Sequence, residues 1–343
     1  LPIVQAPMGW IARSQLASAV SNAGGMGIIE TSSGELDNVK EEIRKMRDLT
    51  DKPFGVNIAQ AFVRDPNIVQ FVVDQGIKFV TTSAGSPTRY TEDLKAAGCT
   101  VFHVVPTLAG AIKAVEAGVD GLIVEGGEGG GFKNPNPVAS MVLLPLVRSK
   151  VDVPIIAAGG MVDGATMAAA FALGAEGVQM GTRMVSSLES PVHDNWKHAI
   201  VNAEETGTVF LNKFHSPALR ALRTKRTTEM EKAIDENIFG QFGDAKSLYF
   251  GGDMEAAVPL SGQVAGRVPP FVWFRRSVEF EPPLRMGEQA LWRVNLAPGS
   301  PRTGFHGERC RSRPDNRRCS NTTPLTCATR LRGSSTGVDG RGN

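Results

Sequence analysis

The sequence predicts a (β/α)8 TIM barrel followed by a helical C-terminal subdomain. Eight short apolar runs alternate with amphipathic stretches through residues 1–186, which is the order of elements in a closed parallel barrel. The same kind of helix-to-strand turn, built on an Ala-Gly or Leu-Gly pair, recurs at Gly98, Gly118 and Gly174. Two successive late strands end in glycine, and barrels of this type bind phosphate after their seventh and eighth strands.

Hydrophobic periodicity places the elements in order along the chain. Several runs are apolar on both faces, as buried parallel strands are, and the strands are expected at residues 3–7, 27–30, 54–58, 79–82, 101–105, 121–124, 154–158 and 177–180. Helices with one apolar face are expected between them, including residues 36–49, 68–75, 107–117 and 166–173. Glycine follows several of these helices, as a C-terminal cap requires.

The two glycine turns late in the chain favour a barrel over the alternative fold, an open doubly wound sheet. They are Gly159-Gly160 and Gly181-Thr182, and each joins an apolar strand to a helix. Backbone N–H groups at such a junction can hold a phosphate. A doubly wound sheet accepts the alternation of strands and helices but does not predict two consecutive phosphate turns there. The turns therefore predict a barrel with a phosphate-bearing cofactor.

Composition divides the chain into a barrel at 1–186, a helical subdomain at 187–267 near the barrel mouth, and a tail at 268–343. The N-terminus of the barrel is expected to be incomplete. The subdomain includes a basic amphipathic stretch at 217–235. The tail carries 13 Arg, no Lys and six acidic residues. It is expected to be disordered or aberrantly translated rather than a nucleic-acid arm.

The rest of the composition excludes several classes of protein. Outside the tail the chain has 24 basic and 29 acidic residues. Its folded part therefore lacks the excess of basic residues that is typical of nucleic-acid-binding proteins. No apolar run is long enough to span a membrane. Of the four cysteines only Cys99 precedes residue 300, which favours a reducing, cytoplasmic setting. No His/Cys cluster has the spacing of metal ligands, so no metal is expected.

The predicted strand ends are rich in glycine and amides and poor in acid–base groups. Reactive groups of a barrel lie at these ends, and such a set suits an organic cofactor that carries the chemistry. The run from Glu125 to Gly131 holds five glycines. It is interpreted as backbone that approaches a ligand closely, with a mobile surface loop as the alternative. Asn57 could hold a ring carbonyl and N–H or serve as a turn residue. His103 is expected to line its strand.

These motifs resemble those of the FMN-dependent nitronate monooxygenases, also called 2-nitropropane dioxygenases, and of their close relative enoyl-[acyl-carrier-protein] reductase II. The resemblance covers residues 1–267. It rests on Gln5-Ala6-Pro7-Met8, Gly55-Val56-Asn57, residues 124–131, Ala157-Ala158-Gly159-Gly160 and residues 177–183. Features of the reductase side recur at residues 80–85, 104–106, 189–197 and 261–266.

The resemblance implies FMN at the barrel mouth. Pro7 and Met8 would back the flavin, and Asn57 would contact its ring system. Glu125 stands where the family usually has Gln. The remaining positions that match cofactor contacts are Gly130, Gly159, Gly160, Gln179, Met180, Gly181 and Thr182, of which the glycine turns lie at the phosphate.

One departure from the family pattern bears on catalysis. Both subfamilies place His at the end of the glycine run, where this chain has Phe132. That His is the expected base for a neutral nitroalkane in the monooxygenases, and the polar partner of substrate or nicotinamide in the reductase. The catalytic residue is therefore unknown. His193 is a candidate, but a role in capping or packing its helix is favoured over a catalytic one.

Three functions remain open from the sequence. Oxidation of a nitronate with FMN and O2 is favoured, because a nitronate is already ionised and needs no protein base. An NAD(P)H-dependent reductase of enoyl thioesters is the second, and a flavin-binding protein without turnover is the third. The expected partner is a small-molecule substrate, either a nitronate or an enoyl thioester, and a homodimer is one assembly that fits.

Overall fold

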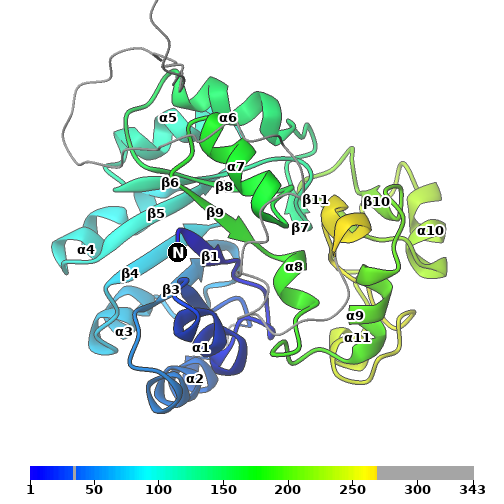
Figure 1. Cartoon of the computed structure of the whole chain (residues 1–343), viewed down its shortest axis with the longest axis horizontal. Coiled ribbons are helices and arrows are strands. Elements are labelled where there is room, and N and C mark those ends of the chain that lie inside the picture. The colour runs from blue at the N-terminus through cyan, green and yellow to red at the C-terminus, as the bar shows by residue number, and fades with distance from the viewer. Residues whose placement is uncertain (34–35, 269–343) are drawn as a thin grey trace, which may run out of the picture. The chain divides into compact units, whose positions relative to one another are not determined.

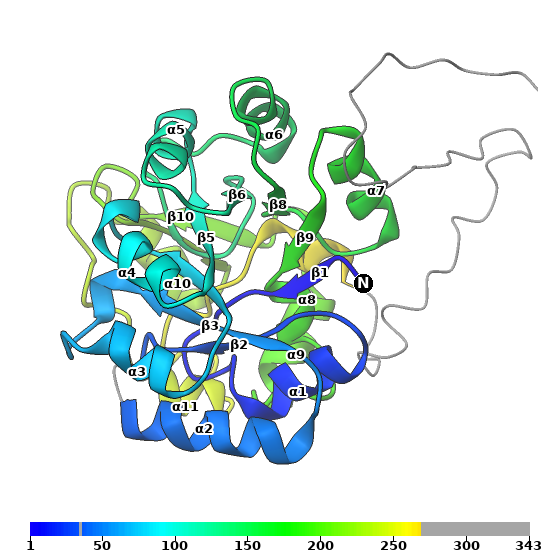
Figure 2. The same cartoon turned by 90° about the vertical axis from the view of Figure 1, so that its left-hand side faces the viewer.

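A computed structural model describes residues 1–33 and 36–268. Its main sheet has eight parallel strands in the order β1-β9-β8-β6-β5-β4-β3-β2. The two outer strands meet, because Val4 forms a parallel bridge with Met26 and the Gln5 N–H donates to the Met26 carbonyl at 3.0 Å. Figures 1 and 2 show the helices around this sheet. The barrel predicted from the sequence is thus confirmed.

The barrel strands match the eight predicted runs to within two residues at each end. They are β1 Ile3–Gln5, β2 Gly27–Glu30, β3 Phe54–Ala59, β4 Phe79–Ser83, β5 Thr100–Val105, β6 Gly121–Glu125, β8 Ile155–Ala158 and β9 Gly177–Met180. The α-helices packed around them are α1 Ser14–Asn22, α2 Leu36–Leu49, α3 Ile68–Asp74, α4 Thr91–Ala96, α5 Leu108–Glu116, α6 Ser140–Arg148, α7 Gly164–Ala172 and α8 Thr182–Val185. Two short 3-10 turns, η1 Gln60–Phe62 and η2 Pro87–Arg89, follow β3 and β4.

Local sequence signals account for several helix ends. The Thr107 hydroxyl accepts from the Gly110 N–H at 3.1 Å at the start of α5, and the Asp163 carboxylate accepts from the Thr166 N–H at 2.8 Å at the start of α7. These are N-caps of the usual kind. At the other end of α7, Gly174 has φ +96°, a left-handed conformation that favours glycine.

The hydrophobic core has two layers in the barrel. Alternate strand residues such as Val56, Leu122 and Val178 pack outward in one large cluster with the helices. A smaller cluster that includes Val4, Ile28 and Ile123 packs on itself inside the barrel. This alternation follows from the two-residue period of a strand.

Residues 187–267 contain helices, as predicted, but also two strands that were not predicted. The helices are α9 Asp194–Val201, α10 Lys225–Lys232 and α11 Ala245–Tyr249, with the 3-10 turn η3 Gln263–Arg267. The strands β10 Thr208–Leu211 and β11 Ala218–Leu222 form an antiparallel sheet with β7 Gly131–Lys133, which comes from the glycine run. The amphipathic stretch at 217–235, which lies in a segment expected to be helical, therefore divides between β11 and α10. The helix spacing there overlaps the alternation of a short strand, which periodicity alone cannot resolve.

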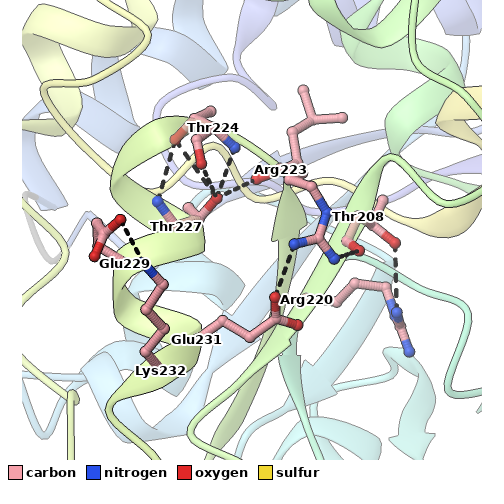
Figure 3. A network of polar contacts seen from close by, with 9 residues as sticks. Thr208, Arg220, Arg223, Thr224, Thr227, Glu229, Glu231 and Lys232 are labelled. Carbon is pink, nitrogen blue, oxygen red and sulfur yellow. Dashed lines mark hydrogen bonds and ion pairs between the residues drawn. The ribbon is translucent and has the colours of Figure 1, made fainter.

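A polar network fixes β11 against β10 and α10. Thr224 and Thr227 form the capping box that begins α10, and Arg223 pairs with Glu231 at 2.7 Å while reaching the Thr208 carbonyl at 3.4 Å. Figure 3 shows these contacts and the neighbouring Arg220. The network therefore sets the position of the strand that carries Arg220.

The end of the folded part lies one residue beyond the predicted boundary. Val268 was assigned to the tail, but it is buried and belongs to the large core cluster. All described residues fall within the same compact unit. The rest of the Arg-rich tail, from residue 269, lies outside the described residues. Within the described residues, no helix is long and apolar enough to cross a membrane.

Candidate flavin site at the barrel mouth

Polar residues occupy inward-facing positions at the carboxyl ends of the barrel strands. Glu30 follows the interior residue Ile28 by two positions, and Asn57 is the register partner of Glu30. On the other side of the barrel, Ala158 pairs in register with Glu125 and with Gln179. Because alternate strand residues share a face, Asn57, Glu125 and Gln179 are placed together around the mouth. The sequence predicted all three as site residues.

Asn57 is fixed by the neighbouring strand. It is 2% exposed, and its Nδ2 donates to the Thr81 hydroxyl at 2.9 Å and to the Thr81 carbonyl at 3.2 Å. Its Oδ1 accepts a long hydrogen bond of 3.4 Å from Ser83. The amide is therefore held rigidly, with its oxygen as the weaker-bound end, which suits an acceptor for a ring N–H.

Glu125 forms an ion pair that the sequence did not predict. Lys133 donates to the Glu125 carboxylate. The Lys133 side chain is 4% exposed and that of Glu125 is 24% exposed. A buried ammonium needs such a partner, because an unpaired buried charge is costly. The carboxylate at this position, where the resembling family usually has Gln, is therefore matched by a cation from β7.

The glycine run is a folded loop tied at both sides, not a mobile one. The Gly126 N–H donates to the Ala158 carbonyl at 2.9 Å, and the Gly127 N–H donates to the Val138 carbonyl at 2.8 Å. Arg220 of β11 donates to the Gly127 carbonyl at 2.9 Å, and burial lowers the pKa of this guanidinium. A Cβ at Gly130 would lie 2.6 Å from the Gly262 nitrogen. Close backbone packing thus explains Gly130, and its contact with a cofactor stays a prediction.

The two glycine turns have the form expected of a phosphate site. Gly159 and Gly160 have φ of +80° and +81°, and Gly181 caps α8. Among the described residues, no acceptor bonds to the N–H of Gly160 or Gly181. A Cβ at Gly181 would meet nothing nearer than Ala6 Cβ at 3.5 Å, with the Met8 sulfur at 3.8 Å. The turn is therefore open on that side and next to Met8.

The glycine turns indicate a phosphate, and one buried oxygen atom indicates that a ring binds beside it. Gln179 is 7% exposed, and its Oε1 has no hydrogen-bond donor among the described residues. A buried acceptor left unpaired costs about 1–3 kcal/mol. A ring N–H of a bound cofactor would satisfy it. Together with the free N–H groups, this atom shows that the residues present fit FMN.

Thr182 makes a hydrogen bond within the protein, in addition to its predicted contact with the cofactor. Its Oγ1 accepts from the Gly262 N–H at 2.8 Å, in a buried environment. The bond ties the second glycine turn to the segment that packs on Gly130. Thr182→Val would remove the acceptor and leave the Gly262 N–H unpaired. We expect a loss of about 1–3 kcal/mol in the free energy of unfolding.

The control for this prediction is Thr182→Ser, which keeps the acceptor. Chemical denaturation of the three proteins measures the difference. A Val variant as stable as the Ser variant would show that the hydrogen bond contributes nothing measurable.

Phe132, at the family His position, lies in an aromatic cluster. Its ring centroid is 5.6 Å from that of Phe62, which follows β3, and 6.2 and 6.1 Å from those of Phe239 and Phe242. Phe132 and Phe239 are 36% and 47% exposed. The cluster therefore joins the barrel mouth to the 187–267 segment by an apolar surface, and it offers no proton-exchanging group.

The two histidines weighed from the sequence have structural partners. His193 begins α9, where its Nδ1 accepts from the Asn195 N–H at 3.1 Å. This contact confirms the capping interpretation, while a catalytic role stays a prediction. His103 lies in β5 with its Nδ1 2.7 Å from the Thr82 hydroxyl. Burial lowers its pKa to about 4, so the ring is neutral near pH 7.

One acidic residue at a predicted strand end was given no role from the sequence, although it shapes the mouth. Glu30 is 1% exposed and accepts from the Trp10 N–H at 3.0 Å and from the Ser33 N–H at 2.9 Å. It thereby holds the loop that follows Pro7 and Met8. Its position at a strand end was the only available signal, since its partners lie on loops that periodicity does not describe.

Comparison with known proteins identifies the family of the chain. The family model described as nitronate monooxygenase matches residues 1–66 and 59–241. The (3aS,4S,5R,7aS)-5-hydroxy-7a-methyl-1-oxo-octahydro-1H-indene-4-carboxyl-CoA dehydrogenase of Rhodococcus jostii (strain RHA1) is 37% identical, over 67% of this chain and 65% of its own. This chain thus spans less than two thirds of that relative's length.

Two further proteins match this chain, one by its sequence and one by its solved structure. A probable nitronate monooxygenase of Staphylococcus saprophyticus is 30% identical, over 68% of this chain and 79% of its own. The solved structure of FabK from Thermotoga maritima has a TM-score of 0.76 and 38% identity, covering 81% of this chain and 90% of that one. The similarity in fold is therefore accompanied by similarity in sequence.

Proposed function

The chain belongs to the nitronate monooxygenase family, and from this premise we propose that it is an FMN-dependent oxidoreductase that oxidises nitronates with O2. Bound FMN would supply the two-electron redox chemistry. The chain's own groups bind and orient it. The N–H groups of Gly160 and Gly181 would bind its phosphate, Gln179 and Asn57 would accept hydrogen bonds from its ring, and Pro7 and Met8 would pack behind it.

The observation that carries the choice of a nitronate is the surrounding of Phe132. The position that would deliver a base to a neutral carbon acid holds a phenyl ring packed against three others. A nitronate is already deprotonated at carbon, so its oxidation does not require that base. Of the reactions considered, nitronate oxidation depends least on the histidine that Phe132 replaces.

The test begins with the purified protein. Its absorption spectrum should show a bound flavin, and mass spectrometry of the released chromophore should give the mass of FMN. Oxygen consumption should then rise on addition of a nitronate. A colourless protein that does not take up FMN on reconstitution would refute the cofactor, and a flavoprotein inert toward nitronates would refute the substrate.

A second candidate is an oxidoreductase of acyl thioesters that uses NAD(P)H. It is favoured by the relative at 37% identity, whose name specifies a carboxyl-CoA substrate. A thioester enzyme would exchange electrons with a nicotinamide cofactor rather than pass them to O2. Anaerobic consumption of NAD(P)H with an enoyl thioester would support this candidate, and its absence together with nitronate oxidation would reject it.

The proposal also covers the cellular location and the oligomeric state of the protein. We place the protein in the cytoplasm, because its cysteine usage suits a reducing compartment, and we propose a homodimer as its assembly. Analytical ultracentrifugation of the flavin-loaded protein measures that state directly.

A further inference from the structure

A cluster of four phenylalanine rings lies at the rim of the barrel mouth. The ring centroid of Phe132 is 5.6 Å from that of Phe62, 6.2 Å from that of Phe239 and 6.1 Å from that of Phe242. Phe62 belongs to the turn after β3, and Phe132 belongs to β7, which begins at the end of the glycine run that follows β6. Strands β5 and β4 separate β6 from β3 in the sheet. The contact between Phe62 and Phe132 therefore joins two strand ends across part of the mouth.

Two of the four rings anchor the cluster, and the other two are accessible. Phe242 packs on the smaller hydrophobic core of the 187–267 segment, and Phe62 is half-buried. Phe132 and Phe239 are 36% and 47% exposed. Each of these two outer rings contacts Phe242 as well as the other outer ring, with 5.4 Å between the centroids of Phe239 and Phe242. Packing within the cluster therefore fixes the positions of the exposed ring surfaces.

The accessible surface of the cluster is apolar. The cation–π contacts found in the described part of the chain involve other rings, those of Tyr90, Phe210 and Phe214. Exposed apolar patches mark sites that bind a ligand or another protein. A small ligand is favoured here, because Phe62 follows the same strand, β3, that carries Asn57, one of the residues proposed to contact the flavin ring.

We propose that the phenylalanine cluster binds the carbon substituent of the nitronate, and that the enzyme therefore prefers aryl nitronates to those of short nitroalkanes. This inference rests on the function proposed above and names its substrate class. The reacting carbon of a nitronate has to reach the flavin, so its substituent must occupy the adjoining surface. An aryl ring there could pack on Phe132 and Phe239, and an aromatic pair of this kind strengthens binding by about two- to twelvefold beyond the burial of its area.

The experiment uses the FMN-loaded protein and compares a ligand that carries a phenyl ring with one that carries a methyl group. Binding is measured by calorimetric titration with phenylacetate and acetate, whose carboxylates resemble a nitronate group but do not reduce the flavin. Reactivity is measured with the nitronates of phenylnitromethane and nitroethane, as the rate of flavin reduction in anaerobic stopped flow. Comparing the ratio of the two rates between variants cancels the difference in intrinsic reactivity of the two nitronates.

The test variant is Phe239→Ala, which removes one accessible ring of the cluster. The matched control is Phe214→Ala. It removes a ring of the same segment that is 66% exposed and lies beside Lys213, outside the cluster. Flavin content and melting temperature are measured on both variants, so that a loss of cofactor or of folding is not mistaken for a loss of preference.

We expect the wild-type protein to bind phenylacetate about tenfold or more tightly than acetate. Phe239→Ala should reduce this preference, and the preference in flavin reduction, by about two- to twelvefold, whereas Phe214→Ala should keep both. Equal binding of the two carboxylates by the wild type overturns the inference, and so does a preference that Phe239→Ala leaves intact or that both variants lose equally. If neither nitronate reduces the flavin, the proposed function fails, while the carboxylate titration still tests the cluster.

Discussion

Gly181→Asp is expected to abolish flavin retention while leaving the barrel folded. The substitution would place a carboxylate at the turn proposed to hold the phosphate. Two like charges about 4 Å apart repel by about 4 kcal/mol at the effective dielectric constant of a protein surface, which is a loss of affinity of about a thousandfold. The fold should tolerate the side chain, because a Cβ at Gly181 meets nothing nearer than 3.5 Å and the residue has φ −105°.

Gly181→Ala is the matched control, since it adds the Cβ without the charge. Flavin occupancy is measured from the visible absorbance of each purified protein, followed by titration with free FMN. Circular dichroism and the melting temperature report on folding. If the Asp variant keeps as much flavin as the Ala variant, the phosphate does not lie at this turn.

The barrel could be predicted from the sequence because its signals are local. Each strand is an apolar run bounded by a glycine or polar turn, and the run at residues 177–180 became β9 without change. Helix 36–49 was likewise predicted with its observed ends. Asn57 and Gln179 could be placed at the mouth by the same reasoning, since a residue at the carboxyl end of a barrel strand belongs to the mouth.

The features that were missed depend on contacts between distant segments. Strand β7 has three residues and exists because β11 pairs with it, Phe132 lying opposite Leu219. The partner of Glu125 is Lys133, on a different sheet. The aromatic cluster around Phe132 assembles side chains from three separate parts of the chain. Neither periodicity nor composition reports such pairings, and a three-residue strand has too little pattern to detect.

Phe132 is expected to make the enzyme depend on substrate that is ionised beforehand. A positioned base typically contributes about 10²- to 10⁴-fold to the rate of proton abstraction. Without one on the glycine loop, the wild-type protein should oxidise nitronates and react very slowly with neutral nitroalkanes at the same pH. Reduction of the flavin by each form in anaerobic stopped flow measures this difference, because it isolates the half-reaction from O2.

Phe132→His should restore part of the reaction with neutral nitroalkanes, with a rate that rises as the imidazole loses its proton. The gain should be partial, because Phe62, Phe239 and Phe242 surround the position and offer no hydrogen bond to orient the ring. Phe132→Leu is the control, since it removes the phenyl ring without adding a base and should show no gain.

Equal rates for both substrate forms in the wild type would show that another base is present. His193→Asn and Glu125→Gln would then separate the two candidates. The first removes an imidazole that caps α9, and the second neutralises a carboxylate at an inward-facing position of the mouth, held there by Lys133. Whichever variant selectively loses the neutral substrate identifies the base. If neither form reduces the flavin, nitronate oxidation is excluded and the acyl-thioester candidate takes its place, since that reaction draws its reducing equivalents from a nicotinamide and does not depend on a carbanion prepared in solution.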